Sequence, residues 1–249
     1  MTTLPVFLVD TLPTGGPAVL DGPEGRHAAT VRRLRPGEQL VLSDGNGGMA
    51  RCAVTATERD LVRLDVTESW TESAARPRVV LAQALVKGER GELAVELATE
   101  AGVDEVLPWR ASRCVAKWDD GPRGDKALAR WRGTAREAAK QARRAWCPEV
   151  AEPVTTRQLA DRIGRCAGAL VLHESAEHGL AGLDLPADGD LLIVVGPEGG
   201  ITDAELDQLT AAGAVAVRLG ATVLRASTAA AVALGALGVL TPRWSDKCG

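Results

Sequence analysis

Hydrophobic and polar positions divide the chain into two regions that follow different patterns. Before residue 70, short β-like runs are separated by turn sequences, and the runs cover residues 6–9, 39–43, 50–55 and 61–66. Several short strands at close spacing favour a small β-barrel. Residues 24–34 are expected to form a short helix that ends before Pro36 and Gly37.

From residue 78 the pattern changes to apolar runs that alternate with helical segments. Strands are expected over residues 78–85, 105–109, 169–172, 191–195 and 214–219, and helices over residues 91–101 and 125–146, the latter ending at Cys147 and Pro148. This alternation predicts an α/β domain with a mostly parallel sheet. The polar stretch 71–77 is the expected linker, so we predict two domains, over residues 1–73 and 74–249.

The last two predicted strands each run into a loop that contains glycine. Residues 191–195 lead into Gly-Pro-Glu-Gly-Gly at 196–200, and residues 214–219 lead into a loop that begins at Gly220. In an open α/β sheet, such loops form a pocket at the carboxyl ends of the strands. Neither loop has the residues of a Walker-type phosphate loop, and neither reads G-x-G-x-x-G. Because Pro197 also lacks an N–H group, the pattern predicts an uncharged or zwitterionic ligand.

Composition narrows the class of protein. The chain has 249 residues, of which 45% are hydrophobic, but no apolar run approaches a membrane span and the N-terminus lacks the features of a signal peptide. The five cysteines (52, 114, 147, 166 and 248) include no C-x-x-C pair, and the three histidines show no H-x-x-x-H spacing. We therefore expect a cytoplasmic protein with reduced thiols and no metal site.

Charge is concentrated in parts of the chain. The net charge is −4, yet residues 123–144 contain eight basic and two acidic residues, which gives a local charge of +6. In the helix expected there, Arg132, Arg136, Lys140 and Arg144 follow steps of four and lie along one stripe. The opposite face is apolar and consists of Leu128, Trp131, Ala135, Ala138 and Ala142. The stripe fits either an anionic partner or a solvated helix face, and charge alone does not decide between them.

A series of motifs carries a resemblance to a known family. The motifs occupy residues 27–34, 87–90, 98–103, 112–115, 137–144, 196–200 and 219–229, and they occur in order from about residue 24 to residue 237. Together they resemble the RsmE family, the small-subunit ribosomal RNA methyltransferases E of the SPOUT superfamily. Gly-Pro-Glu-Gly-Gly alone is shared by relatives, whereas the ordered set is specific.

The resemblance implies a fold and an activity. The N-terminal region would be a PUA-like RNA-binding β-barrel, and the C-terminal region a SPOUT domain whose parallel sheet contains a trefoil knot. The implied reaction is methylation of N3 of a uridine in 16S ribosomal RNA of the 30S subunit, with S-adenosyl-L-methionine as cofactor, by a homodimer. Two alternatives stay open: another SPOUT enzyme that methylates a 2′-hydroxyl or a different base, and a non-catalytic RNA-binding assembly factor.

The resemblance also assigns roles to residues. The residues implied to bind the cofactor are Leu172, His173, Glu174, Val195, Gly196, Pro197, Glu198, Gly199, Gly200, Leu219, Gly220, Val223, Leu224, Thr228 and Ala229. Those expected to bind RNA are Arg26, His27, Arg32, Arg33, Arg113, Arg136, Lys140 and Gln141. Arg225 and Arg144 are the expected catalytic residues, because cationic side chains stabilise a uridine anion.

Some residues in these motifs have a local structural explanation. Thr202 and Glu205 have the spacing of a capping box that starts a helix. Ser227 and Thr228 either cap the last helix or contact the ligand. Ser227 also stands where many family members have an acidic residue, so no catalytic role rests on an acid there. The acceptor of the uridine proton is not identifiable from the sequence, although His173 and Glu174 are candidates.

Overall fold

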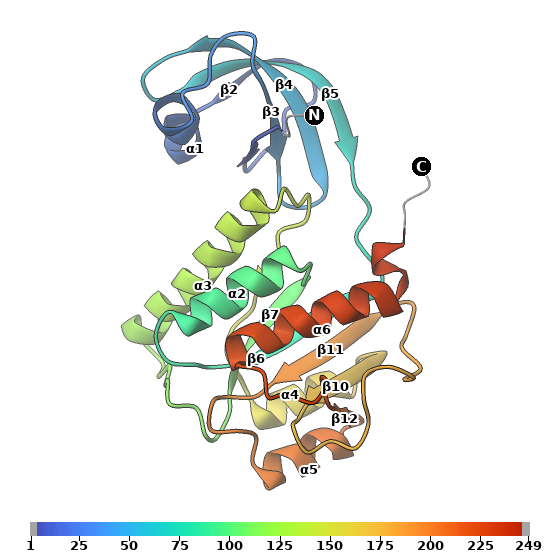
Figure 1. The fold of residues 1–249 in the computed structure, drawn as a ribbon. Coiled ribbons are helices and arrows are strands. Elements are labelled where there is room, and N and C mark those ends of the chain that lie inside the picture. The colour runs from blue at the N-terminus through green and yellow to red at the C-terminus, as the bar shows by residue number, and fades with distance from the viewer. Residues whose placement is uncertain (1–3, 246–249) are drawn as a thin grey trace. The chain divides into compact units, whose positions relative to one another are not determined.

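The computed structural model describes residues 4–245, which form two compact units, each with its own sheet (Figure 1). The first unit comprises Met1–Ala74 and Ala139–Cys147, and the second comprises Ala75–Ala138 and Pro148–Gly249. Residues 139–147 join the first unit through hydrogen bonds such as that from the indole Nε1 of Trp146 to the carbonyl oxygen of Glu72, at 2.9 Å. Of the five cysteines, Cys248 lies outside the described residues.

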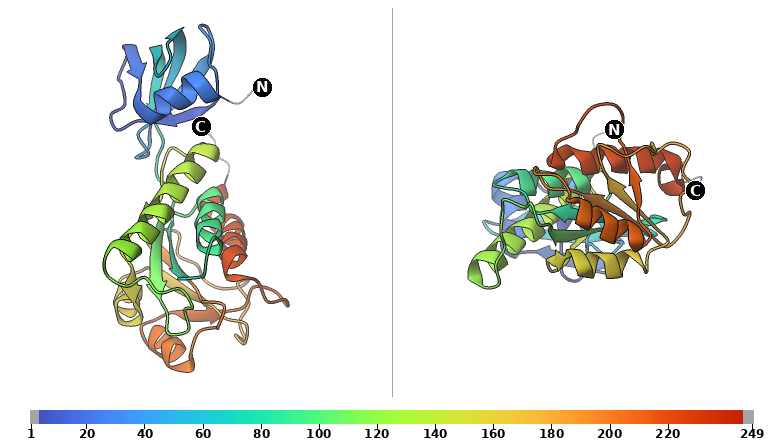
Figure 2. Two further views of the ribbon diagram at one scale, coloured as in Figure 1. Left: turned by 90° about the vertical axis from the view of Figure 1, so that its left-hand side faces the viewer. Right: turned by 90° about the horizontal axis from the view of Figure 1, so that it is seen from below.

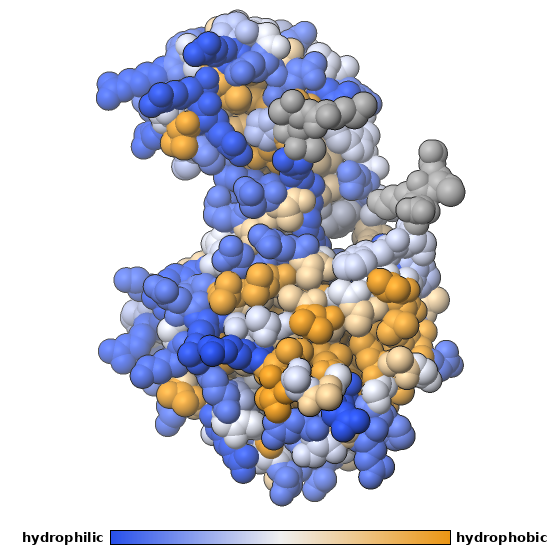
Figure 3. Space-filling model, viewed as in Figure 1, coloured by the Kyte–Doolittle hydropathy of each residue, from blue (hydrophilic) through white to orange (hydrophobic). Residues whose placement is uncertain are grey.

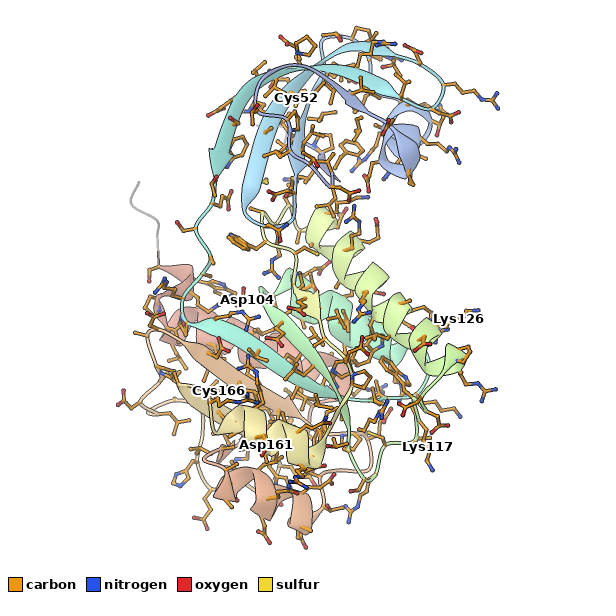
Figure 4. The ribbon with its side chains drawn as sticks, turned by 180° about the vertical axis from the view of Figure 1, so that it is seen from behind. Cys52, Asp104, Lys117, Lys126, Asp161 and Cys166 are labelled. Atoms are coloured by element: carbon orange, nitrogen blue, oxygen red, sulfur yellow. The ribbon has the colours of Figure 1, made fainter. Side chains whose placement is uncertain are left out.

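The first unit contains a five-stranded sheet with the order β1-β3-β4-β5-β2. Its strands are β1 (Val6–Leu8), β2 (Gly16–Leu20), β3 (Gln39–Ser43), β4 (Gly48–Thr57) and β5 (Val62–Thr71). Only the pair of β1 and β3 is parallel. Inward-facing side chains such as Phe7, Leu42 and Leu64 form its core, together with Cys52 (Figure 4). Burial, with a smaller contribution from Asp65, raises the pKa of the Cys52 thiol to about 11.

Two features of the first unit differ from the pattern expected. The predicted helix over residues 24–34 is a short α-helix, α1 (Gly22–Arg26), followed by a π-helical turn, η1 (His27–Val31). The sequence pattern did not predict β2, because Gly16 and Pro17 are turn-forming residues. Its pairing with β5 supplies the hydrogen bonds that hold it as an edge strand.

The second unit is built on a parallel sheet, which confirms the predicted α/β class. Its strands are β6 (Arg78–Ala84), β7 (Glu105–Arg110), β8 (Glu149–Val150), β9 (Val154–Thr155), β10 (Gly168–Leu172), β11 (Asp190–Val195) and β12 (Val215–Val217). The order is β12-β10-β11-β6-β7-β8, with β9 also paired to β7, and every pair is parallel. The central strands are continuous apolar runs because helices cover both faces of the sheet (Figure 2).

The helices of the second unit divide between the two faces of this sheet. They are α2 (Arg90–Glu100), α3 (Pro122–Gln141), α4 (Thr156–Ile163), α5 (Asp203–Ala211) and α6 (Ala226–Leu240), followed by a 3-10 turn, η2 (Pro242–Trp244). One core cluster joins α2, α3 and α6 to Leu81 and Ile193, and the other joins α4 and α5 to Ala82 and Val194. Because side chains alternate along a strand, neighbouring residues of β6 and β11 enter different cores.

The expected end of α3 at Cys147 and Pro148 is wrong. The helix ends at Gln141, because Arg143 adopts a left-handed conformation with φ of 56°. The N–H of Arg144 then donates to the carbonyl of Ala139 at 2.9 Å, which closes the last turn. Residues 145–147 instead hydrogen-bond residues 45–47 of the first unit.

The described residues contain no helix that is both long enough and apolar enough to cross a membrane. Within residues 4–245, no cluster of three or more His, Cys, Asp and Glu side chains is arranged to hold a metal ion.

Candidate active site

A pocket of about 750 Å³ lies in the second unit, where three adjacent strands end. β10 ends at Leu172, β11 at Val195 and β12 at Val217, and the three are neighbours in the sheet. The lining comes from residues 86, 90, 113, 172–174, 195–201, 203, 218–219, 222–227 and 229. Its volume is within the range of small-molecule sites, ~300–1,000 Å³. The glycine-containing loops thus form a pocket at the carboxyl edge of the sheet, as their positions predict.

Thirteen of the fifteen residues predicted to bind the cofactor line this pocket. They are Leu172, His173, Glu174, Val195, Gly196, Pro197, Glu198, Gly199, Gly200, Leu219, Val223, Leu224 and Ala229. The other two have local roles. Gly220 adopts a φ of 72°, which suits a turn, and the hydroxyl of Thr228 donates to the carbonyl of Arg225 at 3.2 Å. The assignment of all fifteen residues to cofactor binding stays a prediction.

The loop of residues 196–200 is folded so tightly that Gly196 and Gly199 have little space for a side chain. A Cβ on Gly196 would lie 2.7 Å from Cγ1 of Ile201, and one on Gly199 would lie 3.0 Å from Cβ of Arg113. Gly200 has a φ of 75°, and its N–H donates to the carbonyl of Pro197 at 2.9 Å. Because Ile201 and Arg113 also line the pocket, a larger residue at these positions would reshape its wall.

Four arginines line the pocket: Arg90, Arg113, Arg218 and Arg225. Nη1 of Arg113 donates to the carbonyl oxygen of Gly199 at 3.1 Å, and Nη1 of Arg90 lies 3.9 Å from Oε1 of Glu198. Sequence reasoning assigned no role to Arg90 or Arg218. The position of Arg90 in the pocket was predictable from the sequence. Arg90 begins a helix just after the carboxyl end of β6, at the same edge of the sheet as the glycine loops.

The nearly buried carboxylate of Glu205 ties two walls of the pocket together. It accepts hydrogen bonds from the N–H of Ser112 (2.8 Å), the hydroxyl of Thr156 (3.2 Å), and both the N–H (3.1 Å) and the hydroxyl (2.8 Å) of Thr202. Burial alone would raise the pKa of Glu205, but the hydrogen bonds from Ser112 and Thr202 outweigh it and lower that pKa below its ordinary value. The predicted capping box is confirmed, and it also holds the segment before Arg113.

The start of α6 differs from the capping prediction. The N-cap position is Arg225, which has no capping side-chain hydrogen bond, so neither Ser227 nor Thr228 caps the helix. Ser227 is buried and lines the pocket instead. Of the two residues predicted to be catalytic, Arg225 lines the pocket and Arg144 does not.

The residues predicted to bind RNA have different surroundings. Arg26 is exposed and forms an ion pair with Asp60 at 3.1 Å, while the ring of His27 packs edge-on against Phe7 with centroids 5.8 Å apart. The remaining exposed members of the set are Arg32, Arg33, Arg113, Arg136 and Gln141.

Two members of the expected basic stripe have protein partners within their own units. Lys140 forms an ion pair with Glu24 at 2.9 Å, and only 9% of the Lys140 side chain is exposed. Arg132 donates to the carbonyl of Val150 at 3.0 Å and to Glu152 at 2.9 Å. The stripe is therefore not a uniform exposed surface, and the assignment of Lys140 to RNA binding stays a prediction. Glu24, the partner of Lys140, lies 116 residues away in the sequence.

Comparison with known proteins identifies the family. The chain matches the model of an RNA methyltransferase domain over residues 73–238 and that of an RNA methyltransferase PUA domain over residues 20–67. It is 56% identical to the ribosomal RNA small subunit methyltransferase E of Mycobacterium bovis, over 96% of this chain and 93% of that protein. The chain belongs to the ribosomal RNA small subunit methyltransferase E family.

Other members of the methyltransferase E family agree over the same length. The Bacillus subtilis member is 34% identical over 89% of this chain and 90% of its own. The crystal structure of the member from Neisseria gonorrhoeae, bound to S-adenosyl methionine, is 28% identical and superimposes with a TM-score of 0.86, over 96% of this chain and 98% of that one. The family resemblance based on sequence motifs is confirmed, and so is the combination of an α/β domain with a PUA domain.

Proposed function

We propose that this protein transfers a methyl group from S-adenosyl-L-methionine to N3 of a uridine in 16S ribosomal RNA. The observation that carries the proposal is the pocket at the ends of β10, β11 and β12, whose tight glycine walls adjoin four arginines. Membership of the methyltransferase E family supports the reaction class and the ribosomal RNA substrate. The choice of N3 rests on the family resemblance.

The residues of the pocket fit the proposed cofactor. Leu172, Leu219 and Leu224 offer apolar surface, while the backbone of residues 196–200 approaches the pocket without side chains at the glycines. Such a site suits a ligand that combines an adenine ring with a zwitterionic amino-acid group. Once bound, the cofactor supplies a methyl group on a positively charged sulfur. The trefoil knot implied by the resemblance remains part of this proposal.

The arginines of the pocket have the chemistry that a uridine substrate requires. N3 of uracil carries a proton and becomes nucleophilic when that proton is lost. Cationic groups such as Arg225 and Arg113 stabilise the resulting anion, and holding the ring in line with the methyl group supplies much of the rate. Placement of the base and stabilisation of its charge are therefore the roles we assign to these two side chains.

His173 is poorly suited to accept the uridine proton. Its Nδ1 accepts the N–H of Ser175 at 3.3 Å, so in the neutral ring the proton lies on Nε2. The lone pair of Nδ1 is therefore engaged by the loop backbone and not by a group in the pocket. The carboxylates in the lining, Glu174, Glu198 and Asp203, are the better candidates.

We further propose that the protein acts as a homodimer. Helix α6 contains no charged residue, yet Val232 and Val239 are 48% and 76% exposed, and Figure 3 shows apolar residues gathered over this helix. A helix that is apolar on all sides is normally buried, so a second copy of the chain is the partner that we expect. The partner's Arg144 is then the residue that we expect to reach the pocket.

The test uses 30S subunits from a cytoplasmic extract of a strain that lacks this activity. The subunits are incubated with the protein and S-adenosyl-L-methionine, and the digested RNA is analysed by nucleoside mass spectrometry. N3-methyluridine is expected. A ribose methyl group, or no methylated uridine, would contradict the proposal.

A further inference from the structure

A second cavity, of about 270 Å³, adjoins the segment that carries Arg113. Arg113 lines the first pocket, whereas its neighbours Ser112 and Cys114 line the second cavity. Residues 112–114 therefore form a wall between the first pocket and the second cavity. Because Glu205 accepts the N–H of Ser112, this wall is held in place.

The second cavity combines basic and aromatic side chains. Arg110, Lys117 and Trp118 line it, and Lys117 lies on the loop between β7 and α3 (Figure 4). The indole of Trp118 packs edge-on against Trp131, with ring centroids 4.8 Å apart and an interplanar angle of 75°. Since Trp131 is buried in the core, this contact fixes the position of the Trp118 ring. Aromatic rings beside cationic side chains are typical of sites that stack single-stranded nucleobases.

One hydrogen-bond donor of Arg110, which lines this cavity, has no partner among the described residues. Nη2 of Arg110 donates to Asp120 at 2.9 Å, but the buried Nε of Arg110 has no hydrogen-bond partner among the described residues. A buried donor without a partner costs free energy, so the guanidinium of Arg110 keeps hydrogen-bonding capacity that its contact with Asp120 does not use. The side chain is 35% exposed, which leaves part of this group open to the cavity.

The size and charge of the cavity favour a base over a phosphate group. Its volume is slightly below the usual range of small-molecule sites, ~300–1,000 Å³, which suits one ring system. Asp119 and Asp120 also line it, and their negative charges disfavour phosphate. Burial is the main cause that raises the pKa of the Cys114 thiol in this wall to about 11.

We propose that this cavity binds the nucleobase adjacent to the target uridine, stacked on Trp118, with the part-exposed guanidinium of Arg110 donating to a base carbonyl. The inference rests on the proposed function only in placing the uridine in the first pocket. Arg113 then lies between the two bases, and the cavity selects the sequence context of the methylated nucleotide.

The test measures binding of dinucleoside monophosphates to the full-length protein by calorimetry. Each dinucleotide places one of the four bases on the 5′ or 3′ side of uridine, and uridine monophosphate is the reference. At least one dinucleotide is expected to bind about tenfold more tightly than the reference, in line with the stacking of one base. Trp118→Ala should abolish this gain, whereas Trp118→Phe should keep most of it.

Two further variants separate the proposed contact from general effects. Arg110→Leu should remove the gain for bases with a carbonyl group, while Lys126→Ala, an exposed charge change on α3, should leave it intact. Thermal unfolding of each variant shows whether the fold is retained, and Trp118→Phe and Arg110→Leu decide the question if Trp118→Ala does not fold.

An undiminished gain in both Trp118→Ala and Arg110→Leu would overturn the inference, and so would a wild-type protein that binds no dinucleotide better than uridine monophosphate. Methylation of 30S subunits by the wild-type protein is measured in parallel. Absence of methylation would contradict the proposed function, whereas the dinucleotide measurements test only whether the second cavity binds a nucleobase.

Discussion

The guanidinium of Arg113 donates a hydrogen bond to the carbonyl oxygen of Gly199 over 3.1 Å. This contact joins the loop after β7 to the glycine loop after β11, although the two residues are 86 positions apart in the sequence. Glu205 reinforces it by accepting the N–H of Ser112. The wall of the pocket is therefore one hydrogen-bonded assembly, and changes in either segment should affect the same binding events.

Gly199→Ala should weaken cofactor binding. Its Cβ would lie 3.0 Å from Cβ of Arg113, so Arg113 and the loop must move apart. We expect at least a tenfold loss of affinity for S-adenosyl-L-methionine, measured by calorimetry. Gly133→Ala is the matched control, because a Cβ there meets nothing within 4 Å inside α3. It should leave affinity unchanged and stabilise the protein by about 0.5–1 kcal/mol.

Glu205→Gln should reduce both stability and RNA methylation. The amide cannot accept all the hydrogen bonds that the carboxylate accepts, and we expect a loss of about 2 kcal/mol in the free energy of unfolding at pH 7. Urea unfolding measures the change. Glu177→Gln, at an exposed position, should have little effect. Equal stability of Glu205→Gln and the wild type would contradict the stabilising role assigned to the hydrogen bonds of Glu205.

The contribution of Glu205 should also depend on pH. Its pKa in the folded protein is lowered from the ordinary value of 4.5, so the unfolded chain takes up the proton first as the pH falls. The stabilisation is therefore complete above pH 4.5 and is lost as the pH falls through the folded pKa. The difference in unfolding free energy between the wild type and Glu205→Gln should shrink over that window. A difference that grows with acidification would exclude this account.

Arg225→Ala should slow methyl transfer more than it weakens cofactor binding. Removing one group that stabilises a developing anion typically lowers kcat by about 10²–10³-fold. Single-turnover methylation of 30S subunits measures the rate, and calorimetry measures cofactor affinity. Arg144→Ala should likewise lower RNA methylation far more than cofactor affinity. Comparable losses of rate and cofactor affinity would indicate that these arginines contact the cofactor and not the RNA.

Arg243→Ala should destabilise the second unit strongly. Nη1 of Arg243 lies 2.7 Å from the carboxylate of Asp104, just before β7 (Figure 4), and only 6% of the Arg243 side chain is exposed. It also donates to the carbonyls of Pro77 and Gly102. Losing one partner of a buried ion pair typically costs ~3–5 kcal/mol. Urea unfolding should show a loss of this order, whereas Arg157→Ala, at an exposed position, should not.

Val239→Glu should disrupt the proposed homodimer. Val232 and Val239 are both exposed and lie two helical turns apart on α6, so a charge at Val239 would be buried if a second copy covers this face. Sedimentation velocity should show a shift from dimer to monomer. Val19→Glu, at a 51% exposed position on β2, should leave the assembly unchanged. A dimer that persists in Val239→Glu would place the interface elsewhere.

The sequence by itself determined features that depend on neighbouring residues. The capping box of Thr202 and Glu205 follows from a spacing of three, and the glycine loops follow from apolar runs that end in glycine. The apolar face of α3 follows from helical periodicity, because Leu128, Trp131 and Ala135 are buried as predicted. Local hydrogen bonds and periodic burial are encoded within a few consecutive positions, so they can be inferred from one chain.

Only the tertiary structure decided which distant residues meet. The order β12-β10-β11-β6-β7 brings the ends of strands from across the sequence to one edge, and this places Arg90 and Arg218 in the same pocket. The pairing of Lys140 with Glu24 and of Ser112 with Glu205 likewise spans 116 and 93 residues. Such contacts depend on how the chain packs as a whole. The sequence offers many acidic residues with which one basic side chain could pair, and it does not distinguish between them.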